Sequence, residues 1–128
     1  SPFKNKQRPG TVCMDAPITK DGKPSWLLNQ LGGRFVGLYF TKSPDLANQA
    51  KQKIIDAQLP ITLIPISEQG VNPGQNFLVD TNRLAYQHYD ARAGTIYLIR
   101  PDQHIAARWR EFDINKIKLA YNKAIQNC

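Results

Sequence analysis

"GTIYLIRPDQHIAARWREF", residues 94–112, predicts a β-hairpin and so the last part of a sheet. Residues 96–99 are apolar at every position, which is typical of a strand covered on both faces. Pro101 predicts the turn, because proline presets the backbone angle that a type I turn needs. Residues 104–110 then alternate like an outer strand. Its two faces are expected to be Ile105, Ala107 and Trp109 on one side, and Ala106, Arg108 and Arg110 on the other.

Two segments before the hairpin have the composition of buried strands. Residues 34–41 are apolar on both faces, and residues 60–66 form a second apolar run that Pro60 and Pro65 limit to about five residues. A helix is expected between them over residues 43–58, because Ser, Pro and Asp in succession suit a helix start. Its buried face is expected to contain Leu46, Ala50, Ile54 and Ala57.

Three further helices are expected, each from a capping residue. Ser25 would cap a short helix over residues 25–31, which the glycine pair Gly32-Gly33 would end. Asp80 would cap a helix over residues 81–89, and Asp113 would cap the last helix of the chain. The apolar faces of the last two are expected to be Leu84, Ala85 and His88, and Ile114, Ile117, Tyr121, Ala124 and Ile125.

The order of these elements predicts the fold class. From residue 34 onward it is strand, helix, strand, helix, strand, strand, helix, which is the thioredoxin arrangement. A right-handed crossover makes the first two strands parallel, and the hairpin adds an antiparallel strand. We expect an α/β protein with a thioredoxin-like fold and a central mixed sheet of four to five strands flanked by helices. The domain would cover residues 25–128, after an irregular lead-in over residues 1–24; residues 67–79 would be a loop.

The redox cysteines of that fold are absent from the sequence. A redox-active member needs a thiol at the helix start after the first core strand, where this chain reads FTKSPDL over residues 40–46. Residues 93–95 read Ala-Gly-Thr where active members place a cis-proline before the third core strand. The two cysteines are Cys13 and Cys128, at opposite ends of the chain. A bridge between them and a peroxidatic role for Cys13 both stay open as alternatives.

Charge and hydropathy bear on the class of partner. The formal net charge is +7 and the pI is about 9.6, which would suit binding to phosphate groups. The basic residues are nevertheless scattered and never form a run of four, so no nucleic-acid partner is expected. No apolar run approaches the roughly 18 residues of a membrane helix, so no membrane partner is expected either. The small number of cysteines predicts a reducing, cytoplasmic location.

Three segments resemble the C-terminal domain of FAD-dependent aromatic-ring hydroxylases, the flavoprotein monooxygenases similar to phenol hydroxylase and 3-(3-hydroxyphenyl)propionate hydroxylase. They are RPGTVCMDAPI from Arg8, WLLNQLGGRFVGLYF from Trp26 and YDARAGTIYLIRPDQHIAARWREFD from Tyr89, and the resemblance extends to Asn127. It implies a thioredoxin-like domain without redox cysteines, associated with structural support and subunit contacts. One departure is Gln103, where the family tends to have glycine. A left-handed residue is expected there, at a cost of about 1 kcal/mol.

The resemblance implies FAD and NAD(P)H for a longer parent enzyme. The glycines of this chain never form G-x-G-x-x-G, so both cofactors would be bound by other sequence. The implied partners are the parent's flavin- and substrate-binding domains, and a second copy in a homo-oligomer. We expect no catalytic, cofactor-binding or metal-binding residue within these 128 residues. The alternative function is a stand-alone thiol-dependent protein of the thioredoxin or peroxiredoxin type that uses Cys13.

Several conspicuous residues are expected to be structural. His88 and His104 have no Cys, Asp or Glu at metal-ligand spacing, and Asp80, Asp90 and Asp102 have the positions of caps and turns. Trp26 is expected to be an apolar anchor. Arg108 and Arg110 flank Trp109 on the outer strand, so this edge is expected to be a docking surface rather than a reaction centre.

Overall fold

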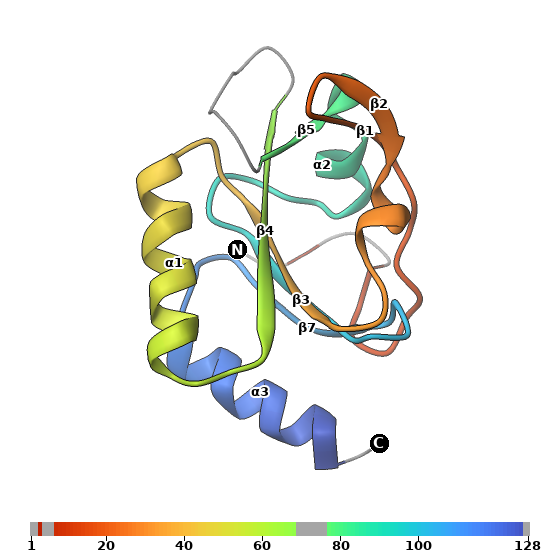
Figure 1. The fold of residues 1–128 in the computed structure, drawn as a ribbon. Coiled ribbons are helices and arrows are strands. Elements are labelled where there is room, and N and C mark those ends of the chain that lie inside the picture. The colour runs from red at the N-terminus through yellow and green to blue at the C-terminus, as the bar shows by residue number, and fades with distance from the viewer. Residues whose placement is uncertain (1–2, 4–6, 69–76, 127–128) are drawn as a thin grey trace.

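A computed structural model of the chain describes residues 3, 7–68 and 77–126, and within them one mixed sheet runs through the molecule (Figure 1). The order of the strands in the sheet is β2-β1-β5-β4-β3-β6-β7. The strands are β1 (Pro17–Lys20), β2 (Lys23–Trp26), β3 (Phe35–Phe40), β4 (Ile61–Glu68), β5 (Leu78–Asp80), β6 (Ile96–Ile99) and β7 (Ile105–Trp109). The helices are α1 (Pro44–Asp56), α2 (Leu84–His88) and α3 (Ile114–Gln126), with the short 3-10 turns η1 (Leu27–Gln30) and η2 (Thr81–Arg83).

The centre of the sheet confirms the predicted arrangement. Strand β3 lies between β4, which is parallel to it, and β6, which is antiparallel. Strand β7 pairs antiparallel with β6 and is the outer strand on that side. The α/β class and the mixed sheet are therefore as expected. The sheet has seven strands rather than four to five, because β1 and β2 extend it beyond β5.

The extension is a hairpin in a segment that was expected to be irregular. Strands β1 and β2 pair antiparallel around Asp21 and Gly22, which both have positive φ angles, 51° and 77°. Asp-Gly is a strong signal for a two-residue hairpin turn, since both positions need left-handed backbone. The expectation of an irregular lead-in is thus wrong for residues 17–24. Ser25 lies in β2 and caps no helix; only the single turn η1 follows it.

The second core strand is longer than predicted and continues through Pro65. Strand β5 pairs with β4 only from Ile66 onward. On that side β4 is still an outer strand at Pro65, where a missing backbone N–H is tolerated. Strand β5 itself lies in the stretch expected to be a loop, and residues 69–76 of that stretch are outside the described residues.

The two long helices begin where their caps predict. Ser43 Oγ accepts a hydrogen bond from Leu46 N at 3.2 Å, and Asp113 Oδ1 accepts from Asn115 N at 3.0 Å. The buried residues of α1 are Ala47, Ala50 and Ile54, whereas Leu46 is 46% exposed, so its predicted burial is wrong. Ile125 of α3 is also exposed rather than buried, because the C-terminal end of α3 projects past the sheet (Figure 1).

Helix α2 is shorter than the predicted helix over residues 81–89. Asn82 and Arg83 have left-handed φ angles of 55° and 60°, so the α-helix begins only at Leu84. The carboxylate of Asp80 still caps it, accepting hydrogen bonds from the N–H groups of Ala85 and Tyr86, each at 2.8 Å. Asp80 is fully buried, and this burial raises the pKa of its carboxyl group.

The sheet separates two cores. The helix-side core lies under α1 and α3 and consists of Phe35, Tyr39, Ala47, Ala50, Ile54, Ile61, Leu63, Phe77, Ile96, Leu98 and Ile117. The other core lies under α2, η1 and residues 7–16, which we call the N-terminal strap. This strap-side core consists of Cys13, Ala16, Ile18, Leu27, Leu31, Val36, Leu38, Phe40, Ile66, Leu78, Ala85, Tyr86, Tyr89, Tyr97, Ile99 and Ile105.

Strand β7 contributes to both cores because its pairing with β6 shifts by one residue. The register changes between Leu98 and Ile99, which pair with Ala107 and Ile105. Such a bulge turns the residues that follow it toward the other face. Ile105 therefore packs in the strap-side core, while Trp109 packs on the helix-side core, and their predicted common face is wrong.

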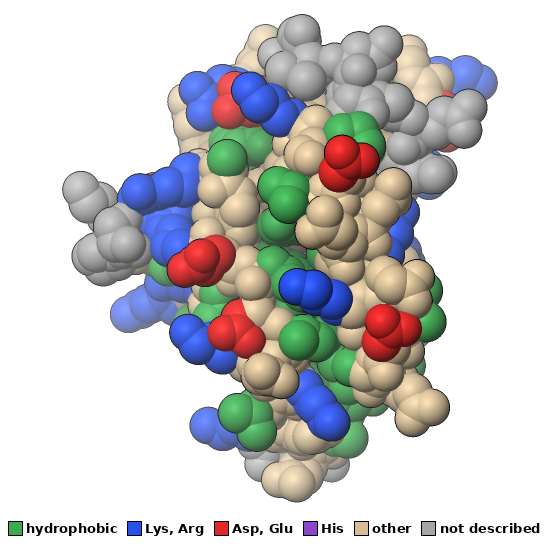
Figure 2. Space-filling model, turned by 90° about the vertical axis from the view of Figure 1, so that its left-hand side faces the viewer, with side chains coloured by type: hydrophobic (Ala, Val, Ile, Leu, Met, Phe, Trp, Pro, Cys, Tyr) green, Lys and Arg blue, Asp and Glu red, His purple; other side chains and the backbone are tan. Residues whose placement is uncertain are grey.

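The surface over α1 is of mixed character. Figure 2 shows hydrophobic side chains along the middle of this face, with basic and acidic side chains scattered among them. Within the described residues, no helix has both the length and the apolar composition that crossing a membrane requires.

Candidate functional site

The two segments at which this fold places thiol chemistry meet at one corner of the molecule. Residues 41–43 connect β3 to α1, and residues 93–95 precede β6. Phe40 N donates to Thr95 O at 2.9 Å, and Gly94 N donates to Phe40 O at 2.8 Å. We call residues 41–43 and 93–95 the β3–α1 corner. Both segments lie where the order of elements predicted them, and neither contains a sulfur atom.

The hydroxyl groups of the β3–α1 corner hold the start of α1. Thr41 is buried, and its Oγ1 accepts a hydrogen bond from Ser43 N at 3.1 Å. Ser43 Oγ in turn accepts from Leu46 N, as the cap of the helix. Each hydroxyl therefore satisfies a backbone N–H that would otherwise lack a partner at the helix start. This corner has the structure of a helix cap.

In the other half of the corner, Gly94 lies close to the backbone of Arg110. Gly94 has a φ angle of 98°, and a Cβ atom there would lie 3.2 Å from Arg110 O. The positive backbone angle and the close approach both favour glycine at this position. The segment after β7 thus packs directly against the loop before β6.

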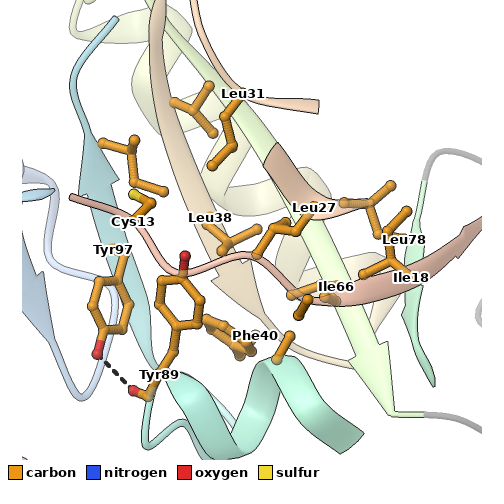
Figure 3. Packing of buried hydrophobic residues seen from close by; sticks show 14 of the residues in the cluster. Cys13, Ile18, Leu27, Leu31, Leu38, Phe40, Ile66, Leu78, Tyr89 and Tyr97 are labelled. Atoms are coloured by element: carbon orange, nitrogen blue, oxygen red, sulfur yellow. Dashed lines mark hydrogen bonds between the residues drawn. The ribbon is translucent and has the colours of Figure 1, made fainter. Parts of the chain in front are cut away.

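Cys13 is buried in the strap-side core (Figure 3). Only 4% of its surface is exposed, so it does not belong to a solvent-exposed lead-in. Burial raises the pKa of its thiol to about 11, although the side-chain hydrogen bond with Tyr89 acts in the opposite direction. At neutral pH the thiolate is present in on the order of one molecule in ten thousand, and the thiolate is the nucleophile. Cys13 is a free thiol, and Cys128 is outside the described residues.

Two tyrosines beside Cys13 fix main-chain carbonyl groups (Figure 3). Tyr97 Oη donates to Tyr89 O, and Tyr89 Oη donates to Met14 O, both at 2.6 Å. Their rings meet edge to face, with centroids 5.0 Å apart. Burial raises the pKa of Tyr89 far above its ordinary value, so its hydroxyl group remains a neutral donor. These contacts tie the strap to the end of α2 and were not found from the sequence.

The arginines of the outer strand bind the protein's own N-terminal segment. Arg108 Nη1 donates to Gln7 O at 2.7 Å, and Arg110 Nη2 donates to Asp90 Oδ2 at 3.0 Å. Both guanidinium groups stack on the ring of Phe3, at 4.3 and 3.9 Å from its centroid. Phe3 therefore covers both guanidinium groups, and docking of another domain at this edge stays a prediction.

The two histidines form contacts outside the β3–α1 corner. His88 Nδ1 is 3.0 Å from Asp15 O and links α2 to the strap. His104 Nδ1 lies 3.3 Å from Asp102 Oδ1, and Arg100 pairs with the same carboxylate. The slight burial of Asp102 acts to raise the pKa of its carboxyl group. The hydrogen bond from the His104 N–H and the charge of Arg100 act in the opposite direction and are stronger together, so this pKa is lowered. The part of the chain that the structure describes contains no group of three or more side chains suited to hold a metal.

The turn between β6 and β7 confirms the expected left-handed residue. Gln103 has a φ angle of 64°. Its Nε2 donates to Leu28 O at 2.9 Å, so the side chain joins the turn to η1. A hydrogen bond of this kind contributes about 1 kcal/mol, which offsets the strain that glycine would avoid.

A groove of about 420 Å³ lies between the strap, β7 and α3, and we call it the β7–α3 groove. Sequence analysis missed it, because it depends on how segments more than a hundred positions apart pack together. Its lining consists of Pro9, Gly10, Arg100, Ile105, Ala106, Ala107, Ala120, Lys123 and Ala124.

Comparison with known proteins shows what this arrangement is similar to. No protein-family model and no curated protein matches the sequence. Among solved structures, aklavinone-11 hydroxylase in complex with FAD and aklavinone matches with a TM-score of 0.69 and 16% identity, over 91% of this chain and 21% of that one. The thiol peroxidase from Chromobacterium violaceum matches with a TM-score of 0.69 and 14% identity, over 96% of this chain and 91% of that one. The exposed lipoprotein thioredoxin Etrx1 from Streptococcus pneumoniae matches with a TM-score of 0.61 and 17% identity, over 86% of this chain and 99% of that one.

These likenesses show a thioredoxin-like fold, as the element order predicted. The chain spans about a fifth of the length of the flavin-dependent monooxygenases that it matches, and nearly the whole length of the thiol peroxidase. The match in fold alone does not separate an accessory domain from a stand-alone thiol protein.

Proposed function

We propose that this chain is a non-catalytic, thioredoxin-like domain of an FAD-dependent, NAD(P)H-using aromatic monooxygenase. It would support the flavin- and substrate-binding domains of that enzyme. The observation that carries the proposal is the β3–α1 corner, where the hydroxyls of Thr41 and Ser43 cap a helix and no thiol is present. The fold match to part of two flavin-dependent monooxygenases and the resemblance of residues 89–113 support the same assignment.

The residues of this chain do not fit FAD or a nicotinamide cofactor. A dinucleotide site needs glycines between a strand and a helix, so that the backbone can approach the pyrophosphate. The turn from β3 to α1 reads Thr41-Lys42-Ser43, and Ser43 already caps the helix. FAD and NAD(P)H would therefore be bound by other domains of the parent, and no chemical step is assigned to residues 1–128.

The thiol-dependent alternative has one observation in its favour, the match over nearly all of the thiol peroxidase. The environment of Cys13 opposes it. A peroxidatic cysteine needs a lowered pKa and access to solvent, whereas Cys13 is buried and its pKa is raised to about 11. Our proposal of a cytoplasmic location rests on the small number of cysteines in the sequence, since disulfide-rich chains belong to oxidising compartments.

The two functions are separated by assays on the purified chain. We expect no flavin absorbance after purification, no oxidation of NADPH, and no consumption of hydrogen peroxide with dithiothreitol as reductant. Peroxide consumption that Cys13→Ser abolishes would establish the thiol function instead. Stoichiometric flavin bound to residues 1–128 would contradict the assignment of cofactor binding to other domains.

The full reading frame of the gene tests the assignment to a monooxygenase directly. We expect a G-x-G-x-x-G fingerprint between a strand and a helix, upstream of residue 1. In the full-length enzyme, sedimentation would test the proposed homo-oligomer. A reading frame that encodes nothing beyond a thioredoxin-like domain would overturn the proposal.

A further inference from the structure

We propose that the β7–α3 groove binds an extended, acidic peptide segment of a partner protein. The peptide would lie along the outer edge of β7, with a carboxylate group between Arg100 and Lys123. This inference rests on the groove alone and holds whether or not the chain belongs to a flavin enzyme.

The floor of the groove is apolar and narrow. Ala106 and Ala107 come from β7, and Ala120 and Ala124 come from α3, where a spacing of four residues places them on one helix face. Because these alanines of β7 and α3 have only methyl side chains, a groove of about 420 Å³ remains between the two elements, which larger side chains would fill. A peptide with small or β-branched side chains can bury them against such a floor.

The charges around this floor have one sign. Arg100 and Lys123 line the groove, and none of its nine lining residues is acidic. Arg100 pairs with Asp102, which lies outside the lining, but a guanidinium group has five N–H donors and can bind a second carboxylate. Within the described part of the chain, Lys123 forms no ion pair. The net charge of +7 adds a long-range attraction for an acidic partner.

Among the described residues, the strap forms backbone hydrogen bonds with β7 at Ile105, the first residue of that strand. Gly10 N donates to Ile105 O at 2.7 Å, and Ile105 N donates to Thr11 O at 2.9 Å. Before Gly10 the strap turns, with Thr11 N bonded to Arg8 O at 3.0 Å. The groove lies where this pairing ends. We place the second extended segment beside Ala106 and Ala107, which line the groove, because sheets commonly bind peptides along an edge.

A peptide of matched charge tests the proposal on the whole chain. The probe is acetyl-Glu-Val-Ala-Val-Glu-amide, and the control peptide has Lys in place of both Glu residues. With the acidic peptide, we expect shifts of backbone amide NMR signals for residues 105–107 and 120–124, and no comparable shifts with the basic peptide.

Three variants separate the groove from general charge effects. Lys123→Glu should weaken binding of the acidic peptide by about tenfold or more, because it replaces attraction by repulsion at the rim. Lys118→Glu makes the same change of net charge at an exposed position of α3 outside the groove, and should alter binding by less than about twofold. Ala120→Leu should weaken binding by filling the floor, with no change of charge. Thermal melts confirm that each variant is folded.

Four results of the peptide experiments would overturn the proposal. They are equal binding of the acidic and basic peptides, equal effects of Lys123→Glu and Lys118→Glu, amide shifts that map away from the groove, and no shifts at millimolar peptide. Concentration-dependent shifts at the groove without any peptide would identify a second copy of this chain as the occupant, and would also overturn it.

Discussion

The two faces of the sheet are closed by different means. Two long amphipathic helices, α1 and α3, cover the helix-side core, and most of the residues in that core are aliphatic or phenylalanine. The strap-side core is covered by short and irregular segments: the strap, η1 and α2. There, buried polar side chains such as Asp80, Tyr89 and Tyr97 bond to the main chain of the covering segments.

The difference follows from where backbone hydrogen bonds go. A helix satisfies its own N–H and C=O groups, so burying its apolar face is enough to hold it. An irregular segment does not satisfy all of them, and each buried group then needs a partner from elsewhere in the chain, either backbone or side chain. The helix-side core should therefore depend on volume, and the strap-side core on individual hydrogen bonds.

The largest effect is expected at Asp80. Replacing Asp80 by Ala leaves the N–H groups of Ala85 and Tyr86 buried without partners, and should lower the free energy of unfolding by about 4 kcal/mol. Urea unfolding followed by circular dichroism measures it. Asp45→Ala, at an exposed position in the first turn of α1, should cost less than about 1 kcal/mol. If both substitutions lowered the free energy of unfolding equally, the proposed difference between the two faces of the sheet would be wrong.

On the helix side, Ile117→Ala should cost about 3 kcal/mol, because it leaves a cavity in a closely packed core. Ile125→Ala on the same helix is the control, and should change the free energy of unfolding by less than about 0.5 kcal/mol, since Ile125 is exposed. If Ile117→Val already costs as much as Ile117→Ala, the helix side depends on shape more than on volume.

Alkaline pH should weaken the strap side through Cys13. Burial raises the pKa of the thiol from its ordinary value of 9.0 to about 11 in the folded protein, so the unfolded state loses its proton first. Stability therefore falls as pH rises from about 9 to 11, with this thiol contributing at most about 3 kcal/mol. Unfolding curves at pH 8 and 10.5 measure the fall, which should be smaller in Cys13→Ser because serine does not ionise there. An identical fall in both proteins would assign it to other groups.

The smallest effect is expected for Tyr97→Phe. This change removes one hydrogen bond to Tyr89 O and keeps the ring, so it should cost about 1 kcal/mol. Tyr121→Phe, on the helix side, is the matched control, because Tyr121 is only half-buried and packs with its ring against Phe35. Thermal unfolding should show a lower midpoint for Tyr97→Phe alone.

The same contrast determines what could be predicted from the sequence. Helices α1 and α3 were predicted with their starts, because Ser43 and Asp113 cap them locally and their apolar residues repeat at helical spacing. The missing thiols of the β3–α1 corner were also evident, since both segments can be located from the order of elements. Each of these features depends on residues near one another in the chain.

The features that were missed depend on distant residues or on competing signals. The Asp21-Gly22 turn was masked by the prolines around it, although it has the signal of a hairpin. The burial of Cys13 depends on Tyr89, and the contact of Arg108 depends on Gln7, which no local pattern indicates. The β7–α3 groove likewise exists only once the strap and α3 have packed.

The contacts of the strap also affect the order in which the parts of the molecule can fold. Gln7 bonds to Arg108 across 101 positions, and Met14 bonds to Tyr89 across 75. Contacts between residues so far apart form slowly, because a long loop must close before they stabilise anything. During synthesis the strap is made before its partners on β7, because it precedes them in the sequence. We therefore expect the thiol of Cys13 to be reactive in a newly made chain and to be protected once these contacts have formed.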